Sequence, residues 1–174
     1  MAKIIGIDPG LAETGVGIIR GKGLKVSGYS FGAISTDKND PTARRLDKIY
    51  SKITAVLKDE TPDLMILEDV FSLEKYPKSG IVLGKVSGVV MLAGYQMGIP
   101  IREVAVREAK KILTGNGNAG KEQLEKAVRR TLEITAPIRP FHSSDALGLA
   151  LIGLFRYNDA RQLRRIPQGK DKLL

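Results

Sequence analysis

The stretch KIIGIDPGLAETGVGII, residues 3–19, places one carboxylate, Asp8, at the end of an apolar run and then turns at once through a Pro-Gly pair. Residues 3–8 and 14–20 read as strands, and the turn between them predicts an antiparallel pair. An Asp in such a turn often only bonds the backbone two residues on. The other interpretation is that the strand holds Asp8 for chemistry, and the rest of the chain has to decide.

Strands continue beyond this pair and then alternate with helices. A third strand over 24–34 extends the antiparallel meander, and the solid apolar run in 63–70 predicts a strand covered on both faces. Helices are expected over 41–60, 79–98, 107–115, 121–134 and 146–155, with a further strand over 99–106. This order predicts one α/β sheet with helices on both faces.

The composition is typical of a single domain with its own core. The chain has 174 residues, of which 43% are apolar, and it has no Cys, so it has neither disulfides nor thiolate chemistry. It has no apolar run long enough to span a membrane, and its start lacks the features of a signal peptide. We therefore expect a cytoplasmic protein, with a folded domain over 1–157 and a basic, flexible tail over 158–174.

The net charge of +9 favours a polyanionic partner, with nucleic acid ahead of an anionic membrane. Residues 156–174 contribute +4 of this charge. No strongly amphipathic basic helix stands out, which weakens the membrane interpretation. Simple solubility remains the alternative explanation of the charge.

Three carboxylates lie at the edges of expected core elements. Asp8 and Glu68 end strands, and Asp145 opens the apolar helix, with His142, the only His, three residues before it. One of the two serines between them is expected to cap that helix. Each acid alone is commonly a cap or a turn residue, but together they predict one cation site, and oxygen ligands suit Mg²⁺ or Mn²⁺ better than Zn²⁺.

These residues belong to motifs that resemble those of the RuvC family of bacterial Holliday-junction resolvases. The resemblance runs from about Ile4 to Leu154. Its five motifs, in order, are GIDPG at 6–10 followed by Thr14, Gly15 and Gly17, EDVF at 68–71, LGKVSGV at 83–89, the stretch from Lys110 to GNGNAGK at 115–121, and HSSDALGLA at 142–150. The chain departs from many members at two positions, where His142 replaces an Asp and Ser87 replaces an Arg.

The resemblance implies an RNase H-like fold, with three antiparallel strands and then two parallel strands in a mixed five-stranded sheet. It implies a homodimeric endodeoxyribonuclease that resolves four-way DNA junctions by paired cuts in strands of like polarity, leaving a 5′-phosphate and a 3′-hydroxyl, and a partnership with a branch-migration helicase. By position, Asp8, Glu68, His142 and Asp145 would form the catalytic and metal site. That site would hold two Mg²⁺ ions, for which Mn²⁺ would substitute.

Basic residues and one aromatic residue are the candidate DNA contacts. Lys110 and Lys121 flank a glycine-containing loop, and they form either a phosphate clamp, which the resemblance favours, or a solvated surface turn. Phe71 is either an ordinary core residue or, by resemblance, a wedge that stacks on a junction base. Lys75 and Lys78 follow in a stretch that we expect to move when DNA binds.

The long helix over 79–98 is rich in glycine, which destabilises a helix unless close packing offsets it. A two-fold dimer contact around Gly84, Gly88 and Val89 would supply that packing. The alternative is tight packing of the helix on its own sheet.

Three other functions share some of these features. An actin-like phosphotransferase has a similar Asp-x-Gly turn, but it needs two lobes, for which 174 residues are too few. A non-catalytic junction-binding scaffold would not need the full acid set. Another RNase H-like nuclease, acting on an RNA–DNA hybrid, would not account for the EDVF motif together with Lys110 and Lys121.

Overall fold

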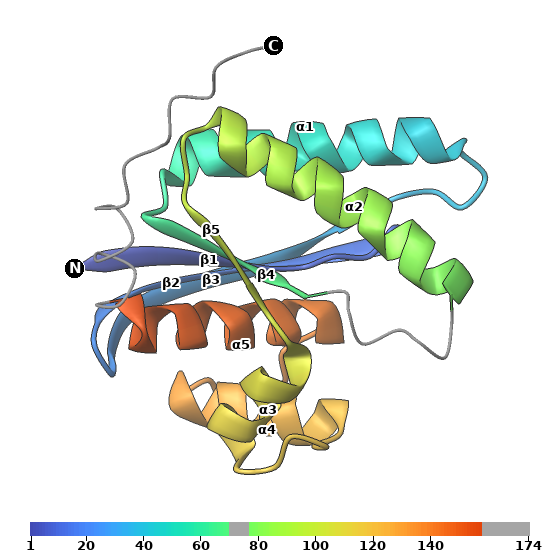
Figure 1. Cartoon of the computed structure of the whole chain (residues 1–174). Helices are drawn as coiled ribbons and strands as arrows, with labels where there is room; N and C mark the ends of the chain where they lie inside the picture. Colours follow the sequence, from blue (N-terminus) through green and yellow to red (C-terminus); the bar gives the residue numbers. More distant parts are fainter. Residues whose placement is uncertain (70–76, 158–174) are drawn as a thin grey trace.

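The computed structural model describes residues 1–69 and 77–157, which form a five-stranded sheet with helices on both faces (Figure 1). The strands are β1 (Ala2–Asp8), β2 (Glu13–Lys22), β3 (Lys25–Ser35), β4 (Leu64–Glu68) and β5 (Ile101–Val104). They lie in the order β3-β2-β1-β4-β5. The first three strands are antiparallel, while β4 pairs in parallel with both β1 and β5. The predicted mixed sheet is confirmed.

Five helices flank this sheet in the described part of the chain. They are α1 (Thr42–Glu60), α2 (Pro77–Gln96), α3 (Val106–Thr114), α4 (Lys121–Thr131) and α5 (Phe141–Phe155). Figure 1 shows α1 and α2 over one face and α5 against the other, with α3 and α4 packed outside α5. Within residues 1–69 and 77–157, none of the helices has the length and apolar character needed to cross a membrane.

Each face of the sheet carries its own core, and β4 contributes to both. Leu64 and Ile66 pack with the residues of α5, whereas Met65 and Leu67 pack with those of α1 and α2. Alternate residues of a strand point to opposite faces, so a fully covered strand needs an unbroken apolar run. The prediction that this strand is covered on both faces is confirmed.

Glycines in β1 and β2 let the backbone of α5 lie directly on the sheet. A Cβ at Gly6 would lie 2.1 Å from the carbonyl oxygen of Ala146, and one at Gly17 would lie 2.5 Å from the amide nitrogen of Leu147. A Cβ at Gly15 would lie 2.0 Å from the carbonyl oxygen of His142. Real Cβ atoms do not approach so closely, so the glycines of the opening stretch fix how near α5 comes to the strands.

The start of α5 differs from the sequence prediction. The helix begins at Phe141, after Pro140, so Asp145 lies inside the helix. The expectation that Ser143 or Ser144 caps it is wrong, because both serines are buried within the first turns. The Ser143 hydroxyl donates to the carbonyl of Gly32 in β3 at 2.9 Å, and that of Ser144 donates to the carbonyl of Phe141 at 2.7 Å. Carbonyl partners satisfy both hydroxyls, so neither interrupts the helix.

Candidate active site

The carboxyl ends of β1 and β4 bring two acids to one edge of the sheet. These strands are parallel neighbours, with Ile7 opposite Leu67, so Asp8 and Glu68 follow side by side. Strand alternation places both acids on the face that α5 covers, since Leu64 and Ile66 also face that helix. Asp8 is buried, and Glu68 is only partly exposed.

The first two turns of α5 bring the other two predicted residues to the same edge. His142 and Asp145 are three residues apart on the helix and therefore share a face. The Nδ1 atom of His142 lies 2.6 Å from Oδ2 of Asp8, which joins α5 to the end of β1. Gly15, opposite Asp8 in the sheet, leaves the room that α5 needs here.

These side chains line a cavity of about 300 Å³. The structure thus brings together six residues singled out from the sequence, namely Asp8, Glu68, Lys110, Lys121, His142 and Asp145. Lys110 comes from α3 and Lys121 from the start of α4, so the two lysines flank the acids from outside α5. The cavity is therefore lined by both acidic and basic side chains.

The cavity also has wall residues that sequence reasoning did not assign to the site. They are Pro9, Gly10, Asp69, Leu83 and Val106. Asp69 lies within the EDVF motif and Leu83 begins the LGKVSGV motif, so membership of a motif was the sequence signal for both. Val106 is an ordinary apolar residue by its sequence context.

The acids disturb one another's protonation. Burial, a hydrogen bond with Asp8 and the charges of Asp8 and Asp145 together raise the pKa of Glu68 to about 9, against the opposing charge of Lys110. Burial and the charge of Asp8 raise the pKa of Asp145 to about 6, against the opposing effect of Lys121 and Lys110. The hydrogen bond to Asp8 raises the pKa of His142 above its usual value. The cluster thus holds more negative charge than its surroundings compensate, which is the condition that a bound cation relieves.

The donor set fits a hard divalent cation, although its side chains are not arranged as a ready coordination sphere. Within residues 1–69 and 77–157, no three His, Asp or Glu side chains form a group that could hold a metal ion as they stand. Oδ2 of Asp8 is engaged by His142. Oδ1 of Asp145, however, is buried without a hydrogen-bond partner among the described residues, and such an atom is costly unless a ligand binds it. Three carboxylates and one imidazole around this atom suit Mg²⁺ or Mn²⁺.

The remaining predicted residues lie elsewhere. Phe71 and Lys75 fall outside the described residues. Lys78 is exposed near the start of α2 and does not line the cavity. On the same helix, a Cβ at Gly84 or Gly88 would meet nothing within 4 Å.

The glycines of α2 therefore have two different surroundings. A Cβ at Gly94 would come within 2.8 Å of Ile101, so packing on the chain's own sheet explains Gly94. It does not explain Gly84 and Gly88, which are exposed, while Val89 beside them is partly buried.

Comparison with known proteins identifies the family. A family model described as crossover junction endodeoxyribonuclease RuvC matches residues 4–153. The chain belongs to the RuvC family. The RuvC protein of Thermotoga maritima is 37% identical over 169 residues, covering 97% of this chain and 98% of the relative. That of Prosthecochloris aestuarii is 36% identical over 151 residues, covering 87% of this chain and 80% of the relative. Both relatives are named crossover junction endodeoxyribonucleases.

Solved RuvC structures agree with this assignment. The structure of T. thermophilus RuvC in complex with a Holliday junction substrate superposes with a TM-score of 0.84 at 28% identity, covering 92% of this chain and 97% of that one. The fold is thus RNase H-like, as the RuvC resemblance implied, and the chain belongs to a family of endodeoxyribonucleases.

Proposed function

We propose that this protein is a divalent-metal-dependent endonuclease that resolves four-way DNA junctions in recombination and repair. One observation carries the proposal: Asp8, Glu68, His142 and Asp145 line a single cavity that Lys110 and Lys121 flank, in a chain of the RuvC family. A T. thermophilus relative, 28% identical, binds a Holliday junction substrate. We infer that this chain binds the same class of DNA.

The two lysines are suited to hold the scissile phosphate against the acids. Lys110 on α3 and Lys121 on α4 approach the cavity from one side and lower the pKa of Asp145 through their charge. An ammonium group binds phosphate oxygens as a point charge, without demanding one exact geometry. We assign these lysines the task of neutralising the negative charge that grows on the phosphate during cleavage.

The acids would hold the metal. Asp8, Glu68 and Asp145, with His142 as the fourth ligand, would bind Mg²⁺ or Mn²⁺, two ions in each site. When bound, such cations supply a nucleophilic water at neutral pH and stabilise charge on the phosphate and the leaving oxygen. His142 has to lose its extra proton before a ring nitrogen is free to ligate or to accept a proton. Its contact with Asp8 opposes that loss, because the carboxylate stabilises the protonated ring.

The proposed reaction is hydrolysis of one phosphodiester bond in each of two strands. Water forms a new P–O bond, the bond from phosphorus to the 3′ oxygen breaks, and that oxygen takes up a proton. The products are a 5′-phosphate and a 3′-hydroxyl. Asp8 is buried at the end of a rigid strand, which would hold its carboxylate in a fixed position. This explains why a carboxylate ends β1.

A second copy of the chain would supply the second cut. The described residues of one chain hold one such acid cluster, whereas resolution needs incisions in two strands of like polarity. We propose a homodimer that packs through α2, where Gly84 and Gly88 leave the backbone open and Val89 is partly buried. The assembly would act in the cytoplasm together with a branch-migration helicase.

A cleavage assay tests the proposed function. We expect the protein to cut a synthetic mobile four-way junction in Mg²⁺ and to leave linear duplex of the same sequence largely intact. Asp145→Asn is the matched control, since it keeps the side-chain size and removes one charge. Equal cutting of junction and duplex, or of an RNA–DNA hybrid in preference to both, would contradict the proposal.

A further inference from the structure

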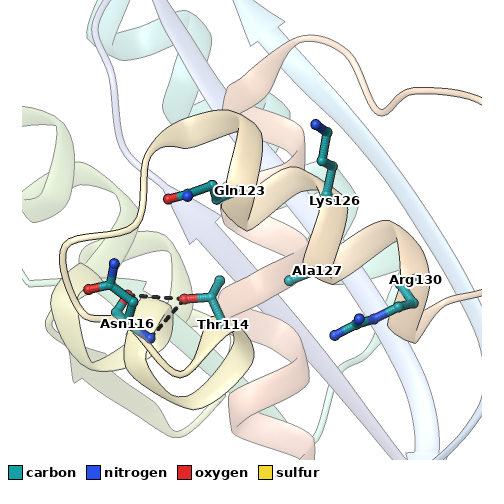
Figure 2. A pocket seen from close by; sticks show the side chains of 6 residues that line it. All are labelled: Thr114, Asn116, Gln123, Lys126, Ala127 and Arg130. Carbon is teal, nitrogen blue, oxygen red and sulfur yellow. Dashed lines mark hydrogen bonds between the residues drawn. The ribbon is translucent and has the colours of Figure 1, made fainter.

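A second polar cavity, of about 370 Å³, lies between the end of α3 and the outer face of α4 (Figure 2). Its lining consists of Thr114, Asn116, Gln123, Lys126, Ala127 and Arg130. None of these residues lines the active-site cavity. The two cavities are neighbours, because Lys110 is one turn before Thr114 on α3 and Lys121 begins the helix that carries Gln123.

Local hydrogen bonds orient both amide side chains so that their donors remain available. Oδ1 of Asn116 accepts the backbone N–H of Asn118 at 2.9 Å. Oε1 of Gln123 accepts the backbone N–H of Gly120, also at 2.9 Å. With each carbonyl oxygen engaged, the NH₂ group of each amide is left to bind an acceptor.

Two uncompensated cations complete the lining. Lys126 and Arg130 are four residues apart on α4 and therefore share a face, and within the described residues neither takes part in an ion pair. Arg129 differs, because its Nε lies 3.1 Å from Oε1 of the buried Glu125. Like charges at this spacing repel each other, and no carboxylate lines the cavity to offset them. The helix dipole favours a basic last turn, where both Arg129 and Arg130 lie, but it does not account for Lys126.

We propose that this cavity is a second phosphate-binding site, which binds the backbone of a junction arm away from the scissile bond. The inference rests on the proposed function, since it assumes junction DNA in the active site. The lining offers amide NH₂ groups, an ammonium and a guanidinium beside the Thr114 hydroxyl and Ala127, and carries no carboxylate. Phosphate oxygens are acceptors that match these donors and charges.

The spacing of the two sites fits a continuous DNA arm. Lys121 and Arg130 are nine residues apart on α4, which corresponds to about 13 Å along a helix at roughly 1.5 Å per residue. That length equals about four base-pair steps at roughly 3.4 Å each. A duplex arm that runs along α4 would therefore span the axial distance between the two sites.

The test compares two double variants in junction binding. Lys126→Ala with Arg130→Ala removes two charges from the cavity. Lys48→Ala with Lys52→Ala removes two exposed charges with the same spacing from α1, on the other face of the sheet, and serves as the control (Figure 1). Affinity is measured without divalent metal at several salt concentrations, on a junction with arms of about 25 base pairs.

We expect the cavity variant to bind about three- to tenfold more weakly than the parent. The slope of the logarithm of the binding constant against the logarithm of the salt concentration should become shallower by about 1 to 2, because each phosphate contact contributes about 0.9. The control should match the parent in both. Cleavage at saturating protein should stay within about twofold for both variants, since neither changes a residue of the active site. Restoring charge with Lys126→Arg and Arg130→Lys should recover the slope.

Arm length gives an independent readout. When the arms are shortened to about three base pairs beyond the cut, the parent should lose its advantage over the cavity variant. Equal slopes and affinities for the cavity variant, the control and the parent on long arms would overturn the second site. If the parent itself neither binds nor cuts junctions, the proposed function fails, and the second site fails with it.

If circular dichroism shows that the double alanine variant is unfolded, the double variant Lys126→Gln with Arg130→Gln replaces it, because glutamine keeps a long side chain without the charge.

Discussion

The carboxyl groups of Asp8, Glu68 and Asp145 line one cavity. Substitutions at these residues can separate their role in cleavage from DNA binding. Asp8→Asn, Glu68→Gln and Asp145→Asn should each lower junction cleavage by at least about 100-fold, because each would remove a charged ligand of the proposed metal site. Binding of the junction should stay equal or tighten, because phosphate neutralisation carries the affinity and a lost negative charge does not weaken it. Gel-shift titrations and cleavage rates measure the two effects separately. A variant that cuts at nearly the parental rate in Mg²⁺ is not missing a ligand.

The same residues predict how metal-free stability depends on pH. The pKa of Glu68 is raised from 4.5 to about 9 and that of Asp145 from 3.8 to about 6, while that of His142 is also raised. The folded state therefore holds more protons than the unfolded state between about pH 4 and pH 9, so the free energy of unfolding should fall as the pH rises through this window. Thermal melts in EDTA from pH 5 to pH 9 measure this fall.

Divalent metal should reverse that dependence. Metal binds the deprotonated carboxylates, so Mn²⁺ or Mg²⁺ should raise the melting temperature more at pH 8.5 than at pH 5.5. The double variant Glu68→Gln with Asp145→Asn should melt higher than the parent in EDTA at pH 8.5 and respond little to metal. A parent whose metal-free stability rises with pH would show that the acids are not mutually destabilising.

At the scale of elements, the approach of α5 to the sheet positions half of the site. A methyl group at position 17 would lie 2.5 Å from the backbone nitrogen of Leu147, so Gly17→Ala forces the helix away from β2. Overpacking of this kind costs about 1 to 3 kcal/mol. We expect a lower melting temperature and a larger loss of cleavage than of junction binding, because His142 and Asp145 move with α5. Gly28→Ala in β3 is the control, since a Cβ there meets nothing within 4 Å, and it should behave like the parent.

The elements also show what the sequence could and could not predict. The antiparallel meander and the doubly covered β4 follow from turn residues and apolar runs, and both were predicted correctly. The start of α5 was placed five residues late, because serines are good caps in general and only the tertiary contact of Ser143 with Gly32 explains why they are not caps here. The convergence of Asp8, Glu68 and Asp145 was predicted from their places at the edges of core elements, but their protonation depends on burial that no local pattern encodes. The cavity lined by Gln123 and Arg130 was not predicted, because local hydrogen bonds that the sequence does not show orient its amide groups.

At the scale of the whole molecule, the proposed paired incisions would need two copies of the chain. Gly88 is exposed on α2 with open space around it, so Gly88→Arg should leave the monomer fold intact while blocking close approach of a partner helix. We expect light scattering to report a monomer with an unchanged circular dichroism spectrum, and a cruciform plasmid to be nicked instead of linearised. Lys85→Ala, at an exposed position on the same helix, tests whether any surface change there has this effect. A Gly88→Arg protein that remains dimeric would place the interface elsewhere.

The most direct test of the account maps both incisions on one junction. Each of the four strands of a mobile junction is labelled in turn at its 5′ end, and the products formed in Mg²⁺ are sized and then treated with DNA ligase. The account predicts cuts at matching positions in two opposite strands of like polarity, ligatable nicks with 5′-phosphate and 3′-hydroxyl ends, and no cutting by Asp145→Asn. Cuts confined to one strand, cuts in strands of opposite polarity, or parental cleavage that persists in EDTA would contradict it.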